Sequence, residues 1–373
     1  MANIFDYLKW RGDLTFTQDA PNGVDALIFS GLSYIPYGHR VEEDPCTPIT
    51  LKEAAEEFLA LPDYETRARA KNDIELLIAA AQTVRFGFTK FCMYRDDFIP
   101  EQETQFAAMT FLLDDGSMFL AFRGTDNSLV GWKEDFNMSF QQTVPAQRLA
   151  VQYTREVAAE FCYPMRLGGH SKGGNLAVFA AARSSPSLQK RIMEVYNNDG
   201  PGFTEYLMGD PGYLAMVPRI RTYIPQSSVI GMLLEHEEPY TVIRSKTVGL
   251  LQHDPYSWNV MGRSFIPVEE ITESSQFVDA TIKDWFAAMS NQERSQLVDV
   301  MFTLLGTGGV ENALDIFHPK NIRTYLKTLS SDENLRRVLS TEFQGLIEAA
   351  KRTKTKFEGT KSAETMLEEG TEE

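Results

Sequence analysis

The chain has 373 residues, of which 43% are hydrophobic and 24% charged, a composition typical of a folded globular protein with one large domain or two. Its formal net charge of −16 argues against binding to nucleic acid or to an anionic membrane surface, because both are polyanions. No apolar run is long enough to predict a membrane span, the N-terminus lacks the pattern of a secretory signal, and three scattered cysteines favour a reducing cytoplasm over a disulfide framework.

The first ninety or so residues are predicted to be mostly helical. One helix is expected over residues 25–34. A second is expected to begin at Thr50, because Glu53 follows it at the spacing of a capping box. Residues 66–84 carry apolar side chains at helical spacing and predict a third helix. We therefore expect residues 1–99 to form a helical N-terminal segment that packs on the core.

Beyond Pro100 the pattern changes to strands that alternate with helices. A hairpin is expected, because two β-prone runs are separated by Asp-Asp-Gly at residues 114–116. The expected strands are 106–113, 117–122, 165–167, 192–197 and 219–224, with helices over 145–161 and from 176. This alternation predicts an α/β fold, with a mostly parallel sheet covered by helices on both faces.

The C-terminal part is again predicted to be helical, from about residue 269 to 350. The final stretch is acidic and almost free of apolar residues, which is typical of a disordered segment. The expected organisation after the N-terminal segment is a core over 100–265, a helical segment over 266–351 and a disordered acidic tail over 352–373.

The most informative motif is Gly-His-Ser-Lys-Gly at residues 169–173, which matches the pattern G-x-S-x-G. In that pattern the serine lies on a tight turn from a strand into a helix, and its hydroxyl points out of the sheet. Glycines flank the turn because strand and helix approach too closely to leave room for a Cβ atom. Ser171 is therefore the predicted nucleophile.

A serine hydroxyl becomes a good nucleophile when a base removes its proton, and histidine is the usual base. In enzymes with this turn the order along the chain is serine, acid, histidine. His253 follows the last predicted strand and is the expected base, with His236 and His318 as alternatives. His236 lies in a charged segment that we expect to be solvated. His39 precedes the turn and breaks the order, and His170 is expected to point away from the reacting centre, in a packing or hydrogen-bonding role.

The acid that orients the histidine is expected to be Asp199. It follows a predicted strand and begins a glycine-rich turn, which is where open α/β sheets place site residues. An ordinary Asp-Gly turn is the competing interpretation. Asp210 and Asp254 are the alternative acids.

Acyl transfer also needs donors for the oxyanion that develops during the reaction. One is expected to be the backbone N–H of Lys172, the residue after the nucleophile. The other is expected from Thr125, in the loop after an earlier strand, through its N–H and its hydroxyl. Asp135 is expected to brace this loop as a structural acceptor.

The chain resembles the class 3 lipases, a group of the α/β-hydrolases, over roughly residues 106–258. The resemblance rests on Phe122-Arg-Gly-Thr-Asp126, Gly131-Trp-Lys-Glu-Asp-Phe136 and Gly169-His-Ser-Lys-Gly-Gly174. It implies that Thr125 contributes to the oxyanion hole and that the Trp132 and Asp135 pair supports it. From Asn3-Ile-Phe-Asp-Tyr-Leu-Lys-Trp-Arg-Gly-Asp13 onward the chain is more similar still to the Mbeg1-like proteins, a bacterial family grouped with the α/β-hydrolases.

The chain departs from the lipase pattern at two places. The lipases usually place their acid after the next strand, where this chain has Ser227 and Ser228. Either the acid has moved to Asp199 or the triad is incomplete. Lys172 replaces the common leucine; it could favour an anionic acyl group, but we expect a solvated surface lysine.

These residues predict a serine hydrolase of carboxylic esters, with lipid or thioester substrates included, that needs no metal or organic cofactor. The alternatives are a non-catalytic binding or scaffolding protein and an acyltransferase, which would use the same residues. The apolar segments 208–216 and 229–234 are candidates for an acyl pocket, although core packing is the interpretation that we favour. The acyl-chain length, the oligomeric state and the biological role stay open.

Overall fold

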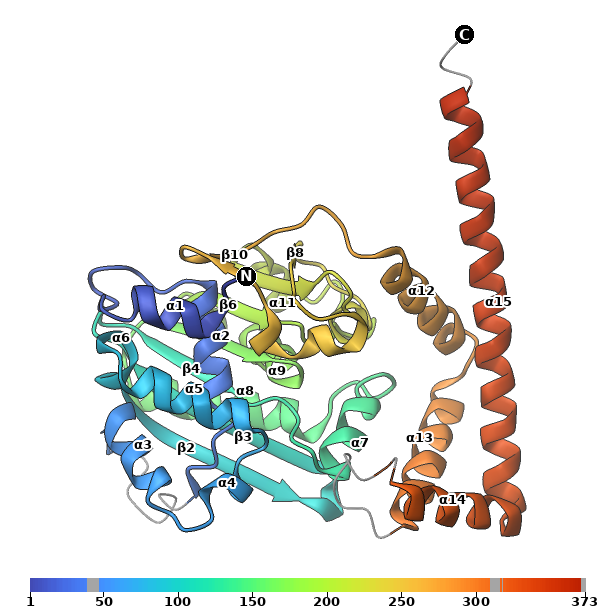
Figure 1. Cartoon of the computed structure of the whole chain (residues 1–373), viewed down its shortest axis with the longest axis horizontal. Helices are drawn as coiled ribbons and strands as arrows, with labels where there is room; N and C mark the ends of the chain where they lie inside the picture. Colours follow the sequence, from blue (N-terminus) through green and yellow to red (C-terminus); the bar gives the residue numbers. More distant parts are fainter. Residues whose placement is uncertain (39–46, 309–315, 317, 370–373) are drawn as a thin grey trace. The chain divides into compact units, whose positions relative to one another are not determined.

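The computed structural model describes residues 1–38, 47–308, 316 and 318–369 of the chain (Figure 1). The chain divides into two compact units, Met1–Ile271 and Thr272–Glu373. The first unit contains a sheet with helices on both faces, and the described part of the second is helical. His39 and Cys46 lie outside the described residues.

The sheet of the first unit consists, in the described part of the chain, of eight strands that lie side by side in chain order. Strands β4 to β8 are parallel to one another, and β1 to β3 extend one edge in antiparallel fashion. The strands are β1 Ile49–Thr50, β2 Lys90–Ile99, β3 Thr104–Leu112, β4 Met118–Phe122, β5 Met165–His170, β6 Ile192–Asn198, β7 Ile220–Pro225 and β8 Tyr240–Ile243. The predicted α/β fold with a mostly parallel sheet is confirmed.

A hydrophobic core lies on each face of the sheet, because successive side chains of a strand point to opposite faces. In β4, Phe119 and Ala121 belong to one core, and Leu120 and Phe122 to the other. Helices from the N-terminal region cover the first core: α1 Ile4–Arg11, α2 Gly23–Leu32, α3 Leu51–Leu59 and α5 Lys71–Ala81. Helices that follow the parallel strands cover the second: α8 Pro145–Glu160, α9 Lys172–Ala182 and α11 Pro211–Met216.

The N-terminal helices and the first hairpin follow the local sequence signals. The Thr50 side chain accepts from the Glu53 backbone, and the Glu53 carboxylate accepts from the Thr50 backbone, so the predicted capping box is confirmed. Gly116 lies in the turn between β3 and β4 at φ 79°, a conformation that glycine adopts without strain. The shorter elements are α4 Tyr64–Arg67, α6 Val84–Gly87, α7 Leu129–Asn137, α10 Pro186–Gln189, β9 Val260–Met261, β10 Ser264–Phe265 and the 3-10 turns η2 Pro100–Gln102, η3 Val217–Arg219, η4 Ile230–Met232, η5 Gly249–His253 and η6 Pro255–Ser257.

Strand β2 lies in the part of the chain for which we expected only helices. It pairs antiparallel with β3, and its register shifts between Cys92 and Arg95, where Met93 adopts φ 55°. A strand beside a sheet edge forms because the neighbouring strand offers unpaired N–H and C=O groups. That partner becomes available only in the folded chain, so the local pattern before Pro100 did not reveal it.

The second unit is built from long helices: α12 Glu273–Ala287, α13 Asn291–Gly306, α14 Pro319–Ser331 and α15 Glu333–Glu369. Helix α15 packs against the other three, and Val300, Leu335 and Val338 form a small apolar cluster. The helix continues through residues 352–369, where the sequence predicts a disordered tail; Lys354 and Glu358 form an i,i+4 ion pair there. Among the described residues no helix combines the length and the apolarity that a membrane crossing requires.

Candidate active site

Ser171 lies at the turn between β5 and α9, as the motif predicts. Its backbone angles are φ 58° and ψ −133°, a combination that costs free energy for a residue with a side chain. The flanking glycines are required by space, because a Cβ atom on Gly169 would lie 2.1 Å from the carbonyl carbon of Gly173. A Cβ atom on Gly173 would lie 2.1 Å from the Phe122 carbonyl oxygen. The close approach of strand and helix therefore lifts the Ser171 side chain out of the sheet.

His253 stands between the serine and the predicted acid. It ends the 3-10 turn η5, its Nε2 lies 3.0 Å from Ser171 Oγ, and its Nδ1 lies 2.6 Å from Asp199 Oδ2. Asp199 directly follows β6 at φ 54° and is fully buried. Since a carboxylate only accepts, Nδ1 carries the hydrogen and Nε2 is free to accept from the serine hydroxyl. The structure thus brings these three predicted residues together, in the arrangement that general-base catalysis requires.

The second carboxylate oxygen of Asp199 has its own partner. The hydroxyl of Ser228 donates to Oδ1 over 2.5 Å, and the Asp199 backbone N–H donates to the carbonyl of Tyr223 in the neighbouring strand. Ser228 is one of the two serines at which the chain departs from the lipase pattern. Its hydroxyl contacts the predicted acid, Asp199. We did not predict this contact, because the serine was noted only as a departure from the lipase pattern.

Lys172 directly follows the nucleophile, and the loop that contains Thr125 packs against the same turn, because a Cβ atom on Gly124 would lie 2.5 Å from the carbonyl oxygen of His170. The Thr125 hydroxyl donates to Asp135 Oδ2 over 2.6 Å. Asp135 therefore braces the loop, and the hydroxyl that we expected to serve the oxyanion is used for this purpose. Burial raises the pKa of Asp135 to about 6, although the charge of Lys172 and the Thr125 hydrogen bond oppose the rise.

The expectation that Lys172 has a solvated side chain is wrong. The side chain is 1% exposed, and its ammonium group lies 3.0 Å from Glu134 Oε2. It also donates to the backbone and side-chain oxygens of Gln105, each over 2.8 Å. Glu134 in turn accepts from the backbone N–H groups of Gln105 and Ala146. A buried ammonium is tolerated here because every one of these groups compensates its charge, and only the folded chain brings them together.

His170, the residue before Ser171, is buried and contacts the backbone of His253. His170 Nε2 donates to the carbonyl of His253 over 2.8 Å, and its Nδ1 lies 3.1 Å from the Tyr34 hydroxyl. Its ring lies 4.7 Å from that of His253. Burial, helped by the charges of His253 and Arg69, keeps the pKa of His170 well below its usual value, so the ring is neutral. The expected hydrogen-bonding role agrees with these contacts; the partner Tyr34, from the N-terminal region, was not predicted.

The other candidate residues lie elsewhere. The segment that contains His236 is solvated as expected at Glu235 and Glu237, but the His236 side chain itself is 8% exposed and contacts Glu238 and Gly231. His318 accepts from a backbone N–H at the start of α14. Asp210 caps α11 and pairs with Arg183, and Asp254 caps η6.

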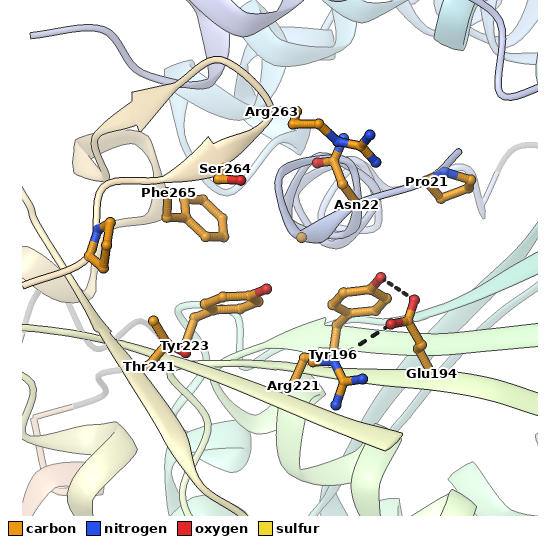
Figure 2. A pocket seen from close by; sticks show the side chains of 12 residues that line it. Pro21, Asn22, Glu194, Tyr196, Arg221, Tyr223, Thr241, Arg263, Ser264 and Phe265 are labelled. Carbon is orange, nitrogen blue, oxygen red and sulfur yellow. Dashed lines mark hydrogen bonds and ion pairs between the residues drawn. The ribbon is translucent and has the colours of Figure 1, made fainter. Parts of the chain in front are cut away.

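A separate cavity of about 510 Å³ lies over the same sheet, between the start of α2 and the β9–β10 hairpin (Figure 2). Its floor holds the rings of Tyr196 and Tyr223, and Glu194 on that floor accepts from the Tyr196 hydroxyl and pairs with Arg221. None of the triad residues lines it, and neither do the segments that we considered for an acyl pocket. In the described part of the chain, no group of three or more His, Cys, Asp and Glu side chains has the arrangement of a metal site.

Comparison with known proteins gives the following relatives. In solved structures, the Rhizomucor miehei lipase in its propeptide complex is similar with a TM-score of 0.36 and 12% identity, covering 65% of this chain and 81% of the lipase. The M37 lipase is similar with a TM-score of 0.36 and 14% identity, covering 57% of this chain and 70% of that lipase. A search of curated proteins gives no match.

The family comparison covers more of the sequence. The model of the Mbeg1-like family matches residues 80–303, which is more than half of the chain and includes Ser171, Asp199 and His253. The resemblance noted from the sequence agrees with this match. The chain belongs to the Mbeg1-like family.

Proposed function

We propose that the protein is a serine hydrolase that cleaves carboxylic esters through an acyl-enzyme. The observation that carries this proposal is the continuous hydrogen-bonded series Ser171–His253–Asp199, with contacts of 3.0 and 2.6 Å. A buried carboxylate, an imidazole and a serine on a strained turn are the parts that activate a hydroxyl for attack on a carbonyl.

Acylation follows from the positions of these groups. Ser171 Oγ bonds to the carbonyl carbon of the ester while its proton passes to His253 Nε2, and Asp199 stabilises the imidazolium that forms. The carbonyl oxygen becomes an oxyanion that accepts from the backbone N–H groups of Lys172 and Thr125. When the intermediate collapses, the bond to the alcohol oxygen breaks and Nε2–H protonates that oxygen. The alcohol leaves, and the acyl group stays on Ser171.

Deacylation repeats these steps with water. His253 takes a proton from the water, whose oxygen attacks the acyl carbon, and the same N–H groups hold the second oxyanion. The imidazolium then returns its proton to Ser171 Oγ, and the carboxylic acid is released. The charge of Lys172 is neutralised by Glu134, so it gives no reason to expect a preference for anionic acyl groups.

A fluorophosphonate probe tests the proposal, because it phosphonylates only serines that a base activates. The native protein should be labelled, and heat-denatured protein should not. Ser171→Ala should remove the labelling and lower the turnover of p-nitrophenyl esters by on the order of 10⁶-fold. Ser187→Ala, which changes an exposed serine of α10, is the matched control and should be labelled like the wild type.

The same experiment can contradict the proposal. Equal labelling of Ser171→Ala and wild type would place the reactive group elsewhere. Complete lack of labelling of the native protein would favour the non-catalytic scaffold. If labelling succeeds, esters of graded acyl length, with and without an alcohol acceptor, distinguish a hydrolase from an acyltransferase.

A further inference from the structure

His236 is a buried histidine that the proposed reaction does not use. It lies between the turn η4 and strand β8, and its side chain is 8% exposed. Its Nε2 lies 2.9 Å from the carbonyl oxygen of Gly231, and its Nδ1 lies 3.2 Å from Glu238 Oε1. Each ring nitrogen therefore faces an oxygen of the protein.

Both partners of this ring are acceptors. A backbone carbonyl can only accept, so Nε2 carries a hydrogen and donates to Gly231. Glu238 accepts from the hydroxyls of Tyr213 and Thr222 as well. Burial of Glu238 opposes its ionisation, but the hydrogen bonds and charge of its neighbours outweigh it, and the net effect lowers the pKa of Glu238. Glu238 is therefore an ionised acceptor that anchors the ring of His236.

A short series of hydrogen bonds connects His236 to the acid of the triad. His236 holds the carbonyl of Gly231, and the backbone N–H of Gly231 donates to Ser228 Oγ over 3.0 Å. The Ser228 hydroxyl donates in turn to Asp199 Oδ1. Contact with the acid is also direct, because a Cβ atom on Gly231 would lie 2.3 Å from Asp199 Oδ1. A displacement of Gly231 would therefore move both neighbours of the Asp199 carboxylate.

We propose that His236 and Glu238 are positioning residues for the reaction: Glu238 anchors the ring of His236, which fixes Gly231 and, through Ser228, orients Asp199 towards His253. The inference rests on the proposed function. Neither residue touches the reacting atoms. Tyr213 from α11 donates to the same Glu238 carboxylate and so helps to hold the ring in place.

Turnover of p-nitrophenyl butyrate tests the coupling to the reaction. Ser228→Ala removes a hydrogen bond to a charged group and should lower kcat by about 10- to 100-fold with little change in KM. His236→Gln should lower kcat by roughly threefold to tenfold, again with little change in KM. Glu238→Gln should lower kcat less than His236→Gln does, because the amide oxygen can still accept from the ring. A purely structural role would lower thermal stability and leave kcat of the folded protein unchanged.

His318→Gln is the matched control, because it replaces an exposed histidine in the second unit; its kcat and KM should equal those of the wild type. Thermal melting checks that each variant is folded. Wild-type kcat in folded His236→Gln and Ser228→Ala would overturn this inference alone. Full activity in Ser171→Ala would overturn the proposed function instead, so the two failures are distinguishable.

Discussion

The proposed site has two sides that are constructed differently. We call Thr125, Glu134, Asp135, Ser171 and Lys172 the nucleophile side, and Asp199, Ser228, Gly231, His236 and Glu238 the acid side. On the nucleophile side, backbone geometry places the proposed oxyanion donors, at the strained turn of Ser171 and at the end of β4, and a buried ion pair supports them. The acid side consists of loop residues after β6 and β7, and side-chain hydrogen bonds position them.

This difference indicates which property each side controls. The ion pair of Lys172 and Glu134 on the nucleophile side is buried, so removal of one of its charges should mainly reduce the stability of the fold. Hydroxyl, imidazole and carboxylate groups on the acid side set the orientation of one carboxylate, so their removal should mainly reduce the rate. The predictions below test this division, beginning with the largest effect.

Asp199→Asn should lower kcat by up to roughly 10⁴-fold with little loss of stability. The amide has the shape of the carboxylate, but its NH₂ group can donate to His253 Nδ1 and so favour the tautomer whose Nε2 cannot accept from Ser171. Single-turnover kinetics with a p-nitrophenyl ester, together with thermal melting, measure both quantities. Activity near that of the wild type would show that another group orients His253.

Lys172→Met should have the opposite effect: a large loss of stability and a small change in kcat. It leaves Glu134 buried without its cation, and loss of one partner of a buried ion pair typically costs about 3–5 kcal/mol. The double variant Lys172→Met/Glu134→Gln should recover part of this loss, because the unpaired charge is removed as well. Urea unfolding measures the free energies of unfolding.

The surface pair of Lys71 and Glu75 provides the control for that measurement. Its side chains are solvated, so Lys71→Met should change the free energy of unfolding little. If Lys172→Met were as mild as this control, the buried pair would not support the nucleophile side. Loss of stability in Lys172→Met with little change in kcat of the folded protein would sharpen the division between the sides.

The smallest expected effect concerns Asp135, whose pKa is raised to about 6 from an ordinary 3.8. Between these values the folded protein binds more protons than the unfolded chain, so the free energy of unfolding should fall as pH rises through this window. Asp135→Asn lacks this titration, and its stability relative to the wild type should therefore increase over the same range. Urea midpoints at several pH values test the slope, and parallel slopes for the two proteins would contradict the shifted pKa.

The sequence by itself determined the α/β class, the hairpin of β3 and β4, and the turn that carries Ser171. These features depend on residues that are neighbours in the chain. Runs of β-prone residues predict strands, Asp-Asp-Gly predicts a tight turn, and glycines two residues before and after Ser171 permit the close approach of β5 and α9. The interactions that stabilise these features join residues close to one another in the chain, so a local pattern is sufficient to predict them.

The tertiary structure decided which side chains meet. Lys172 looked like a surface residue until α7 brought Glu134 against it, and the partner of His170 was unknown until Tyr34 from the N-terminal region reached it. Strand β2 formed where only helices were expected, because β3 offered it a partner. Burial and partners far away in the sequence determine the charge, protonation and pairing of such groups, and a local pattern contains no information about either.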